Sequence, residues 1–396
     1  MVDRSAAGEL RRLPGGRPHV AFVAEQVRGR VPGGIGRFAI ELLAGLSTLD
    51  PLPDLTVVAA ARSGRVGSDP LASLGFPTRA VGGRLLAGAG SLPRAESLPD
   101  RIVTRLWDRG LLGLRSRFDL VHSVSLAAPP TGPVPLTVMV HDVAWRQVPE
   151  AYPPHGLSWH EAALRRAGRR ARGVVVPSRA VQSALLRASV ELDPACVEVI
   201  SEGCDHLPPP DGEAARRLLQ RLGVTGEYLL TVSTLEPRKN LRRLLAAYRQ
   251  MRPELPEPWP LLVVGPSGWG LGLEETDGVV MVGKVDDAVL SALYAGARVA
   301  VYVPLVEGFG LPAVEALAAG APLLVSSSVP SVMEHASPAA VVDARSTEDI
   351  ARALGDLATD DARRAELARA GPASVRERTW AAAARRHVDW WAEVAG

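Results

Sequence analysis

Apolar residues along the chain follow a repeating pattern of strand, loop and helix. The first unit begins at His19 with HVAFVAEQ, continues through a glycine-containing loop, and ends in RFAIELLAGL, whose apolar residues have helical spacing. Further runs of Val, Leu and Ile predict strands at 55–60, 118–124, 136–142, 173–178 and 197–203. Strands without polar alternation are typical of parallel sheets that are buried on both faces. The pattern therefore predicts a doubly wound α/β domain.

The same pattern starts again after a proline-rich stretch. LPPPDG, which begins at Leu207, suits neither a helix nor a central strand, and a new strand begins near Tyr228. Strand-like runs follow at 261–268, 279–285, 299–305 and 322–328. We expect two domains that face a central cleft, one formed by 18–207 and one by 208–378. Residues 1–17 are expected to form a tail, and the helical segment 379–396 is expected to pack back on the first domain.

Composition and charge narrow the classes of partner. The 396 residues include 45 Lys and Arg and 43 Asp and Glu, so the net charge is +2, which does not indicate a nucleic-acid-binding surface. Cys196 and Cys204 have no second Cys or His set at metal-ligand spacing, and we expect reduced thiols.

Neither a signal peptide nor a membrane span is recognisable in the sequence, which predicts a cytoplasmic protein. The arginine-rich stretch 100–118, with Trp107, would form either a solvated domain helix or a peripheral contact with the inner membrane face.

The most informative segment is EGFGLPAVEALAAG, which begins at Glu307. Gly308 and Gly310 allow a tight turn, and Pro312 suits the first turn of a helix, so the helix N-terminus is expected to face the cleft, where it can bind a phosphate. Glu307 precedes this helix and Glu315 lies within it. Carboxylates accept hydrogen bonds from hydroxyl groups, which fits a sugar at one glutamate and a ribose at the other. The alternative for Glu315 is an acid favoured only by the helix dipole.

Two adjacent cations, Arg238 and Lys239, precede another predicted helix. Because the helix dipole disfavours positive charge at this end, we expect an anionic partner, for which a diphosphate is the natural candidate. A solvent-exposed pair is the alternative. The loop PGGIG, which begins at Pro32, is a weaker candidate for a contact with the same phosphates or with the sugar. His141, at the end of the strand LTVMV, would contact a sugar or anchor its loop. Serine-hydrolase, Walker and dinucleotide-binding patterns are absent from the sequence.

Together these segments resemble family 4 of the retaining glycosyltransferases. The resemblance covers nearly the whole chain and rests on GGIGRF, VHDV, VVVPS, TLEPRKNL, LLVVGPSGWG, VGKV and EGFGLPAVEA. It implies the GT-B fold, in which two Rossmann-like domains bind the acceptor and the nucleotide diphosphate sugar, and it implies transfer of a hexose with retention at the anomeric carbon. No cofactor is implied. Since the cleft segments hold no carboxylate pair suited to a metal, we also expect no metal requirement.

The resemblance implies roles for individual residues. Glu307 would bind hydroxyls of the donor sugar, Glu315 would bind the ribose, and Arg238 with Lys239 would bind the departing diphosphate. The remaining contacts would be made to the phosphates by Gly34, Gly308, Phe309, Gly310 and Leu311, to the sugar by His141, and to the base by Lys284 and Val285. Two departures from the family pattern are Thr234, where many members carry an arginine, and SVPSVMEH at Ser328, where relatives often have SLPEV.

The sequence leaves the donor and the acceptor open. EPRKN and GWG are similar to mannosyltransferases of surface polysaccharides, whereas the composition rich in Arg and Ala also suits natural-product glycosylation. The acceptor would be a sugar, a glycolipid or a natural product. Two other functions stay open, a sugar-nucleotide epimerase of related fold and a non-catalytic subunit that binds the donor.

Overall fold

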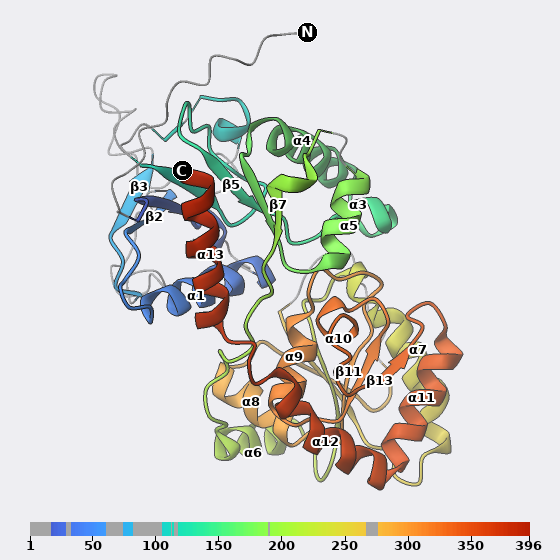
Figure 1. Ribbon diagram of the computed structural model, residues 1–396. Coiled ribbons are helices and arrows are strands. Elements are labelled where there is room, and N and C mark those ends of the chain that lie inside the picture. The colour runs from blue at the N-terminus through green and yellow to red at the C-terminus, as the bar shows by residue number, and fades with distance from the viewer. Residues whose placement is uncertain are drawn as a thin grey trace, which may run out of the picture.

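The chain forms two separate parallel sheets, each flanked by helices (Figure 1). The computed structural model describes residues 17–28, 33–60, 74–81, 105–111, 113–114, 118–188, 191–266 and 276–396. Both sheets have the strand order of a doubly wound domain, so the predicted α/β class with two Rossmann-like domains is confirmed. We refer to the two halves as the first and the second domain.

The first sheet has seven parallel strands in the order β3-β2-β1-β4-β5-β6-β7. Every residue of β1, β4, β5 and β6 is buried, as their uninterrupted apolar sequences predict. The order reverses between β1 and β4, which creates a crevice at the carboxyl ends of these strands. The strands are β1 Val20–Val23, β2 Leu55–Ala60, β3 Thr78–Val81, β4 Leu120–Ser123, β5 Leu136–Met139, β6 Gly173–Val176 and β7 Val197–Val199, and the helices include α1 Gly33–Ser47, α3 Ala144–Gln147, α4 Pro154–Arg170 and α5 Arg179–Ala188.

The second sheet has six parallel strands in the order β10-β9-β8-β11-β12-β13. Its order reverses between β8 and β11, and the loops that follow these two strands carry Arg238, Lys239 and Glu307 of the predicted site. The strands are β8 Leu229–Val232, β9 Leu261–Val264, β10 Val279–Gly283, β11 Val299–Tyr302, β12 Leu323–Ser326 and β13 Ala340–Val342. The helices are α6 Gly212–Arg221, α7 Leu241–Met251, α8 Asp287–Ala295, α9 Leu311–Ala318, α10 Pro330–Met333, α11 Thr347–Thr359 and α12 Asp361–Val375, and a short 3-10 turn, η5, spans Pro237–Lys239.

The last helix, α13 (Trp380–Ala395), belongs spatially to the first domain. Figure 1 shows it beside α1, although it follows the whole second domain in sequence. Trp380 and Trp391 are buried in the same core as Phe22 and Phe38. The chain thus crosses between the sheets twice, once after β7 and once before α13. The exact boundaries expected at 207/208 and 378/379 stay predictions.

The two crossing segments are hydrogen-bonded to each other. Cys204 N donates to the carbonyl oxygen of Arg378 at 2.9 Å, and Trp380 N donates to Asp205 Oδ1 at 2.8 Å. The hinge between the domains is therefore a pair of segments that are held together.

Both cysteines are free thiols, as expected, and burial raises the pKa of Cys204 to about 11.

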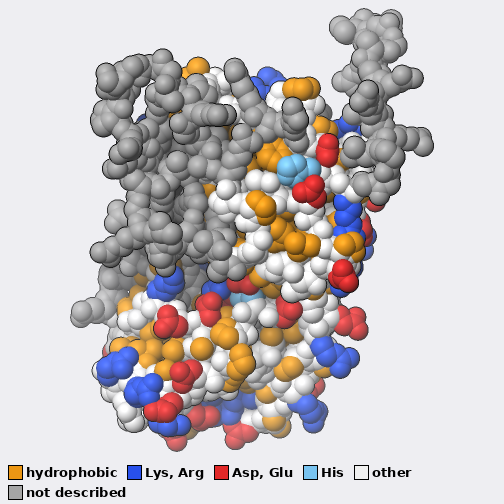
Figure 2. Space-filling view, turned by 90° about the vertical axis from the view of Figure 1, so that its left-hand side faces the viewer, with side chains coloured by type: hydrophobic (Ala, Val, Ile, Leu, Met, Phe, Trp, Pro, Cys, Tyr) orange, Lys and Arg blue, Asp and Glu red, His pale blue; other side chains and the backbone are white. Residues whose placement is uncertain are grey.

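The arginine-rich stretch 100–118 is described only at 105–111, 113–114 and 118. Within it, Trp107 is only 1% exposed, so its ring packs inside the domain. A membrane contact of this stretch stays a prediction, and the sequence GWG lies outside the described residues. No helix in the described ranges is sufficiently long and apolar to cross a bilayer. On the face shown in Figure 2, the described basic and acidic side chains are interspersed.

Candidate active site

Glu307 is the centre of a cluster at the carboxyl ends of β8 and β11. One of its oxygens, Oε1, accepts hydrogen bonds from Tyr302 Oη at 2.7 Å, from Arg238 Nη1 at 3.0 Å and from Lys239 Nζ. Arg238 and Lys239 come from η5, which follows β8, whereas Tyr302 ends β11. The side chain of Glu307 is only 9% exposed. The structure therefore brings three of the predicted catalytic residues into direct contact.

Glu307 and Arg238 stay ionised at neutral pH. Burial opposes the charge of Glu307, but Lys239 and Arg238 lower its pKa to about 2. Burial also opposes the charge of Arg238, yet Glu307, Asp142 and Glu236 raise its pKa. Arg238 Nη2 donates to Glu236 Oε1 at 2.8 Å, and Asp142 of the first domain lies 3.7 Å from Arg238 Nη1.

These contacts change the interpretation of the cation pair. The sequence predicted a diphosphate as its anionic partner, whereas the structure shows that carboxylates of the protein already balance the two charges. Arg238 and Lys239 are 15% and 12% exposed, which excludes the alternative of a solvent-exposed pair. Lys239 Nζ also donates to Tyr302 Oη at 2.9 Å, which leaves one of its three protons without a partner among the described residues and therefore available for a ligand.

Glu315, the second predicted glutamate, is also held by side chains that the sequence did not indicate. His206 Nε2 lies 2.9 Å from Oε1, and Tyr294 Oη donates to Oε2 at 2.9 Å. Glu315 lies in α9 and is 5% exposed. These side chains, in addition to the helix dipole, hold the carboxylate in place. Whether the carboxylate binds a ribose stays a prediction.

The glycine-rich loop between Glu307 and α9 touches the first domain. A Cβ at position 308 would lie 1.8 Å from the carbonyl oxygen of His141, so only glycine fits here. Ser178 Oγ donates to the carbonyl oxygen of Gly308 at 2.7 Å. Gly310 adopts φ 99° as the N-cap of α9, which begins at Leu311. Gly308, buried Phe309, Gly310 and Leu311 are thus placed at a helix N-terminus between the domains, where a phosphate can be bound.

His141 lies beside this loop, but its ring nitrogens face protein atoms. Nε2 is 2.9 Å from the carbonyl oxygen of Val124, and Nδ1 is 3.6 Å from Glu202 Oε1. The ring contacts Phe38 edge-on, with 4.9 Å between ring centroids. This geometry supports the loop-anchoring alternative, and a contact with the sugar stays a prediction.

An ion pair between the domains brings together the other predicted donor-binding loops. Both terminal nitrogens of Arg37 in α1 lie 2.6 Å from the carboxylate oxygens of Asp287 at the start of α8. Gly34 is exposed at the N-terminus of α1, while exposed Lys284 and half-buried Val285 form the loop before α8. The pair therefore places these loops across from each other. The structure does not link them to the Glu307 cluster by a hydrogen bond among the described residues.

A cleft with a volume of about 450 Å³ lies between the domains, next to the cluster. Its polar lining includes Asp142, Gln147, Glu307, Ser328, Glu334 and Arg345. Glu334, from the SVPSVMEH segment, accepts hydrogen bonds from the backbone amides of Arg179 and Ala180 at 3.1 and 2.7 Å. This departure from the family pattern therefore binds the N-terminus of α5 in the first domain.

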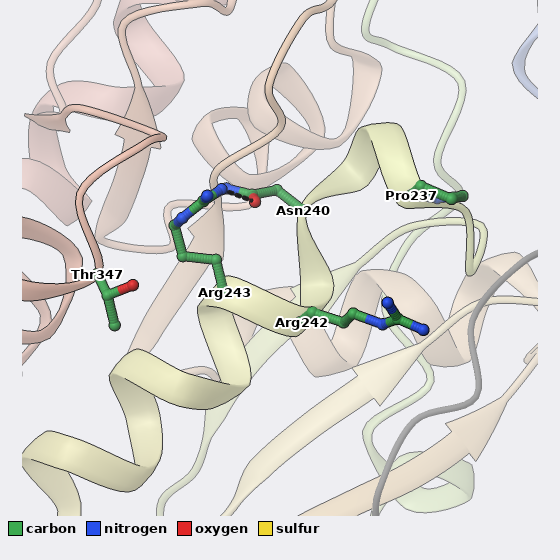
Figure 3. A pocket seen from close by; sticks show the side chains of 5 residues that line it. All are labelled: Pro237, Asn240, Arg242, Arg243 and Thr347. Atoms are coloured by element: carbon green, nitrogen blue, oxygen red, sulfur yellow. Dashed lines mark hydrogen bonds between the residues drawn. The ribbon is translucent and has the colours of Figure 1, made fainter. Parts of the chain in front are cut away.

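A second hollow of about 390 Å³ lies at the start of α7, lined by Pro237, Asn240, Arg242, Arg243 and Thr347 (Figure 3). Asn240 adopts a left-handed conformation, φ 62°, and its amide donates to the carbonyl oxygens of Val303 and Ala344. Figure 3 shows Arg243 reaching back to the Asn240 oxygen, at 2.5 Å. Asn240 thus fixes the end of η5 and with it the position of Lys239.

Among the described residues, no three His, Cys, Asp or Glu side chains are grouped so that they could hold a metal ion. The adjacent carboxylates Asp286 and Asp287 come nearest to the sequence of a metal-binding pair, but Asp287 is bound by Arg37. Metal independence stays a prediction.

Comparisons with known proteins agree with this architecture. Two sequence models match the chain, Glycosyltransferase Family 4 over residues 32–206 and Glycosyl transferases group 1 over residues 220–374. O-antigen chain mannosyltransferase B of Escherichia coli is 29% identical over 61% of this chain and 65% of its own length. D-inositol 3-phosphate glycosyltransferase of Salinispora tropica is 31% identical over 52% of this chain and 47% of its own length. The chain thus matches less than two thirds of the length of either relative.

Solved structures show the same fold. HepE of Anabaena, in complex with UDP and glucose, superposes with a TM-score of 0.67 at 20% identity, covering 94% of this chain and 98% of HepE. WaaG, a glycosyltransferase involved in lipopolysaccharide biosynthesis, gives a TM-score of 0.65 at 15% identity, covering 93% of this chain and 98% of WaaG. With one family match on each domain and this agreement in fold, the chain belongs to the family 4 glycosyltransferases of the GT-B fold.

Proposed function

We propose that the protein transfers a hexosyl group, with mannose favoured, from a nucleotide diphosphate sugar to an acceptor hydroxyl, with retention at the anomeric carbon. The acceptor would be a sugar, a glycolipid or a natural product, and the reaction would serve polysaccharide or natural-product glycan synthesis in the cytoplasm. Mannose is favoured because the relatives include the Escherichia coli mannosyltransferase and a GDP-mannose-dependent mannosyltransferase of Mycolicibacterium smegmatis, 29% identical over 58% of this chain.

The observation that carries this proposal is the asymmetric bonding of Glu307. All three hydrogen bonds from Arg238, Lys239 and Tyr302 go to Oε1. In the described part of the chain, Oε2 accepts no hydrogen bond, and Glu307 lines the cleft between the domains. A carboxylate that is ionised, fixed on one oxygen and open on the other is suited to accept hydrogen bonds from sugar hydroxyls.

The cations beside Glu307 supply the second part of the chemistry. As the bond between the anomeric carbon and the phosphate oxygen breaks, negative charge grows on the diphosphate, and the remaining proton of Lys239 with the guanidinium of Arg238 can stabilise it. The acceptor oxygen forms the new bond to the anomeric carbon, and its proton passes to the departing phosphate. No protein base is required in this scheme, so the protein mainly positions the reactants and stabilises charge.

The test combines binding and turnover. Thermal unfolding of the full chain with UDP, GDP and dTDP should show an increase in Tm for the nucleotide of the donor, since a ligand that binds only the folded state stabilises it. Incubation with the matching sugar donor and a panel of acceptors should then yield a glycoside, in EDTA as well as in Mg²⁺. Failure of all three nucleotides to raise Tm would overturn the proposal, and an epimer formed without acceptor would favour the epimerase. Nucleotide binding without any transfer would favour the donor-binding subunit, and loss of turnover in EDTA would refute metal independence.

A further inference from the structure

His206 lies where the two crossing segments meet, and it contacts the donor-side carboxylate of Glu315. Its Nε2 is 2.9 Å from Glu315 Oε1, and Trp380 Nε1 donates to its Nδ1 at 3.2 Å. The imidazole has no solvent-exposed surface. Trp380 is bound in turn through its backbone amide to Asp205, the neighbour of His206. A side chain from the first crossing segment is therefore bonded to the second segment on one side and to α9 on the other.

The partners of His206 determine which ring nitrogen carries the proton. An indole N–H can only donate, so Nδ1 must accept, and the proton of the neutral ring lies on Nε2. His206 thus donates to Glu315. Burial and the neighbouring Glu315 raise the pKa of Tyr294 well above its ordinary value, so its phenol stays protonated and donates to the other oxygen.

Among the residues that the structure describes, Glu315 therefore receives one hydrogen bond on each carboxylate oxygen, and it keeps further lone pairs on both. Two acceptor oxygens with a fixed separation match the two neighbouring hydroxyls of a ribose. Without His206 the carboxylate would keep, in the described part of the chain, only the hydrogen bond from Tyr294 to one oxygen. It could then rotate about its terminal torsion, which is broad. The orientation of the pair of acceptors depends on the histidine.

We propose that His206 is a positioning residue for the donor nucleotide, which holds the Glu315 carboxylate in the orientation that receives both ribose hydroxyls. The inference rests on the proposed function and assigns no contact between His206 and the donor. His206 also joins the proposed ribose contact physically to the hinge, because His206 and its partner Trp380 belong to the two segments that connect the domains.

The experiment compares ribonucleotides with deoxyribonucleotides on the same variant. Calorimetry with UDP, dUDP, GDP and dGDP gives, for the base that binds, the ratio of the two affinities. In the unaltered protein we expect the ribonucleotide to bind roughly 10-fold or more tightly, because a hydrogen bond to a charged group is lost with the 2′-hydroxyl. His206→Leu should lower this ratio to about 2-fold while changing the affinity for the deoxyribonucleotide little.

Two further variants separate positioning from general damage. His206→Gln should restore most of the ratio, since its amide can donate to Glu315 and accept from Trp380. His155→Leu, at an exposed histidine in α4, should leave the ratio unchanged. Because both nucleotides are measured on one protein sample, a partly unfolded fraction cancels from the ratio.

The outcomes distinguish the two proposals. If no nucleoside diphosphate binds the unaltered protein, the proposed function is overturned and the role of His206 falls with it. If nucleotides bind but the ribose is not preferred, or if His206→Leu keeps the full ratio, only the positioning role is overturned.

Discussion

Removal of the Lys239 ammonium tests whether the Glu307 cluster serves the chemistry or only the fold. Lys239→Ala deletes one cation from Glu307 Oε1, whereas Arg238 at 3.0 Å and Tyr302 at 2.7 Å remain. Since the carboxylate keeps a cation and two hydrogen bonds, we expect the fold to survive.

The pKa of Glu307 sets the size of the stability change. A pKa of about 2, against 4.5 for an unperturbed glutamate, corresponds to about 3 kcal/mol in favour of the ionised form. Because the folded-state pKa is depressed, this stabilisation is fully present above pH 4.5 and is lost as the pH falls toward 2. Removal of one of the two cations should therefore cost about 1 to 3 kcal/mol of the free energy of unfolding at pH 7. The rate effect should be larger, since removing an electrostatic contact to a developing charge costs roughly 10² to 10³ in turnover.

Steady-state kinetics with the cognate donor and acceptor measure this effect. We expect kcat to fall by about 10² to 10³ with little change in KM, and Lys239→Arg to recover only part of the loss, because a guanidinium does not replace a compact ammonium. Arg249→Ala removes an exposed cation from α7, the helix that follows Lys239, and should have no effect. Unchanged kcat and kcat/KM in Lys239→Ala would exclude Lys239 from the mechanism.

Three other features give predictions of their own. Arg37→Glu breaks the ion pair between the domains, so it should lower turnover about 5-fold and raise the radius of gyration in small-angle scattering. Adding Asp287→Arg should reverse both changes. If the double variant shows no rescue, the pair does not hold the two domains together. Gly308→Ala should lower turnover about 10²-fold, since its Cβ would lie 1.8 Å from a carbonyl oxygen of the first domain. Gly212→Ala, whose Cβ would meet no neighbouring atom within 4 Å, should leave turnover unchanged. Equal activities of the two variants would refute the steric argument. Burial lowers the pKa of His387 to about 4 from 6.5, so as the pH falls the unfolded chain is protonated at this histidine before the folded protein is. The free energy of unfolding should therefore fall by about 3 kcal/mol as the pH is lowered from 6.5 to 4. If urea denaturation of His387→Leu shows the same pH slope as the unaltered protein, the assignment is wrong.

The sequence predicted the fold well because buried parallel strands leave a direct apolar signal. It missed β3, with the sequence TRAV, and β13, with AVV, which are both at sheet edges. Both sequences are short, and neither contains a long apolar run of the kind that identified the other strands. Their absence from the prediction did not change the architecture.

The candidate site was predicted residue by residue, but its bonding was not. Glu307 and the cation pair were each recognised from local context, while their contact spans 68 and 69 positions of sequence and has no local pattern. Tyr302 left a signal, a polar aromatic residue at the carboxyl end of an apolar strand. His206 left none, because its partner Glu315 is 109 positions away and is reached only through the crossing segment.

The position of α13 has a consequence for biosynthesis. During translation, β1 and α1 emerge first, but the tryptophans that complete their core arrive only after the entire second domain. At about 5 to 20 residues per second, the ribosome needs roughly 10 s or more to make that domain. Until then the nascent first domain exposes the apolar surface that α13 later covers, which makes it a natural client for chaperones at the ribosome. The second domain has its own separate core and can fold before the first is complete.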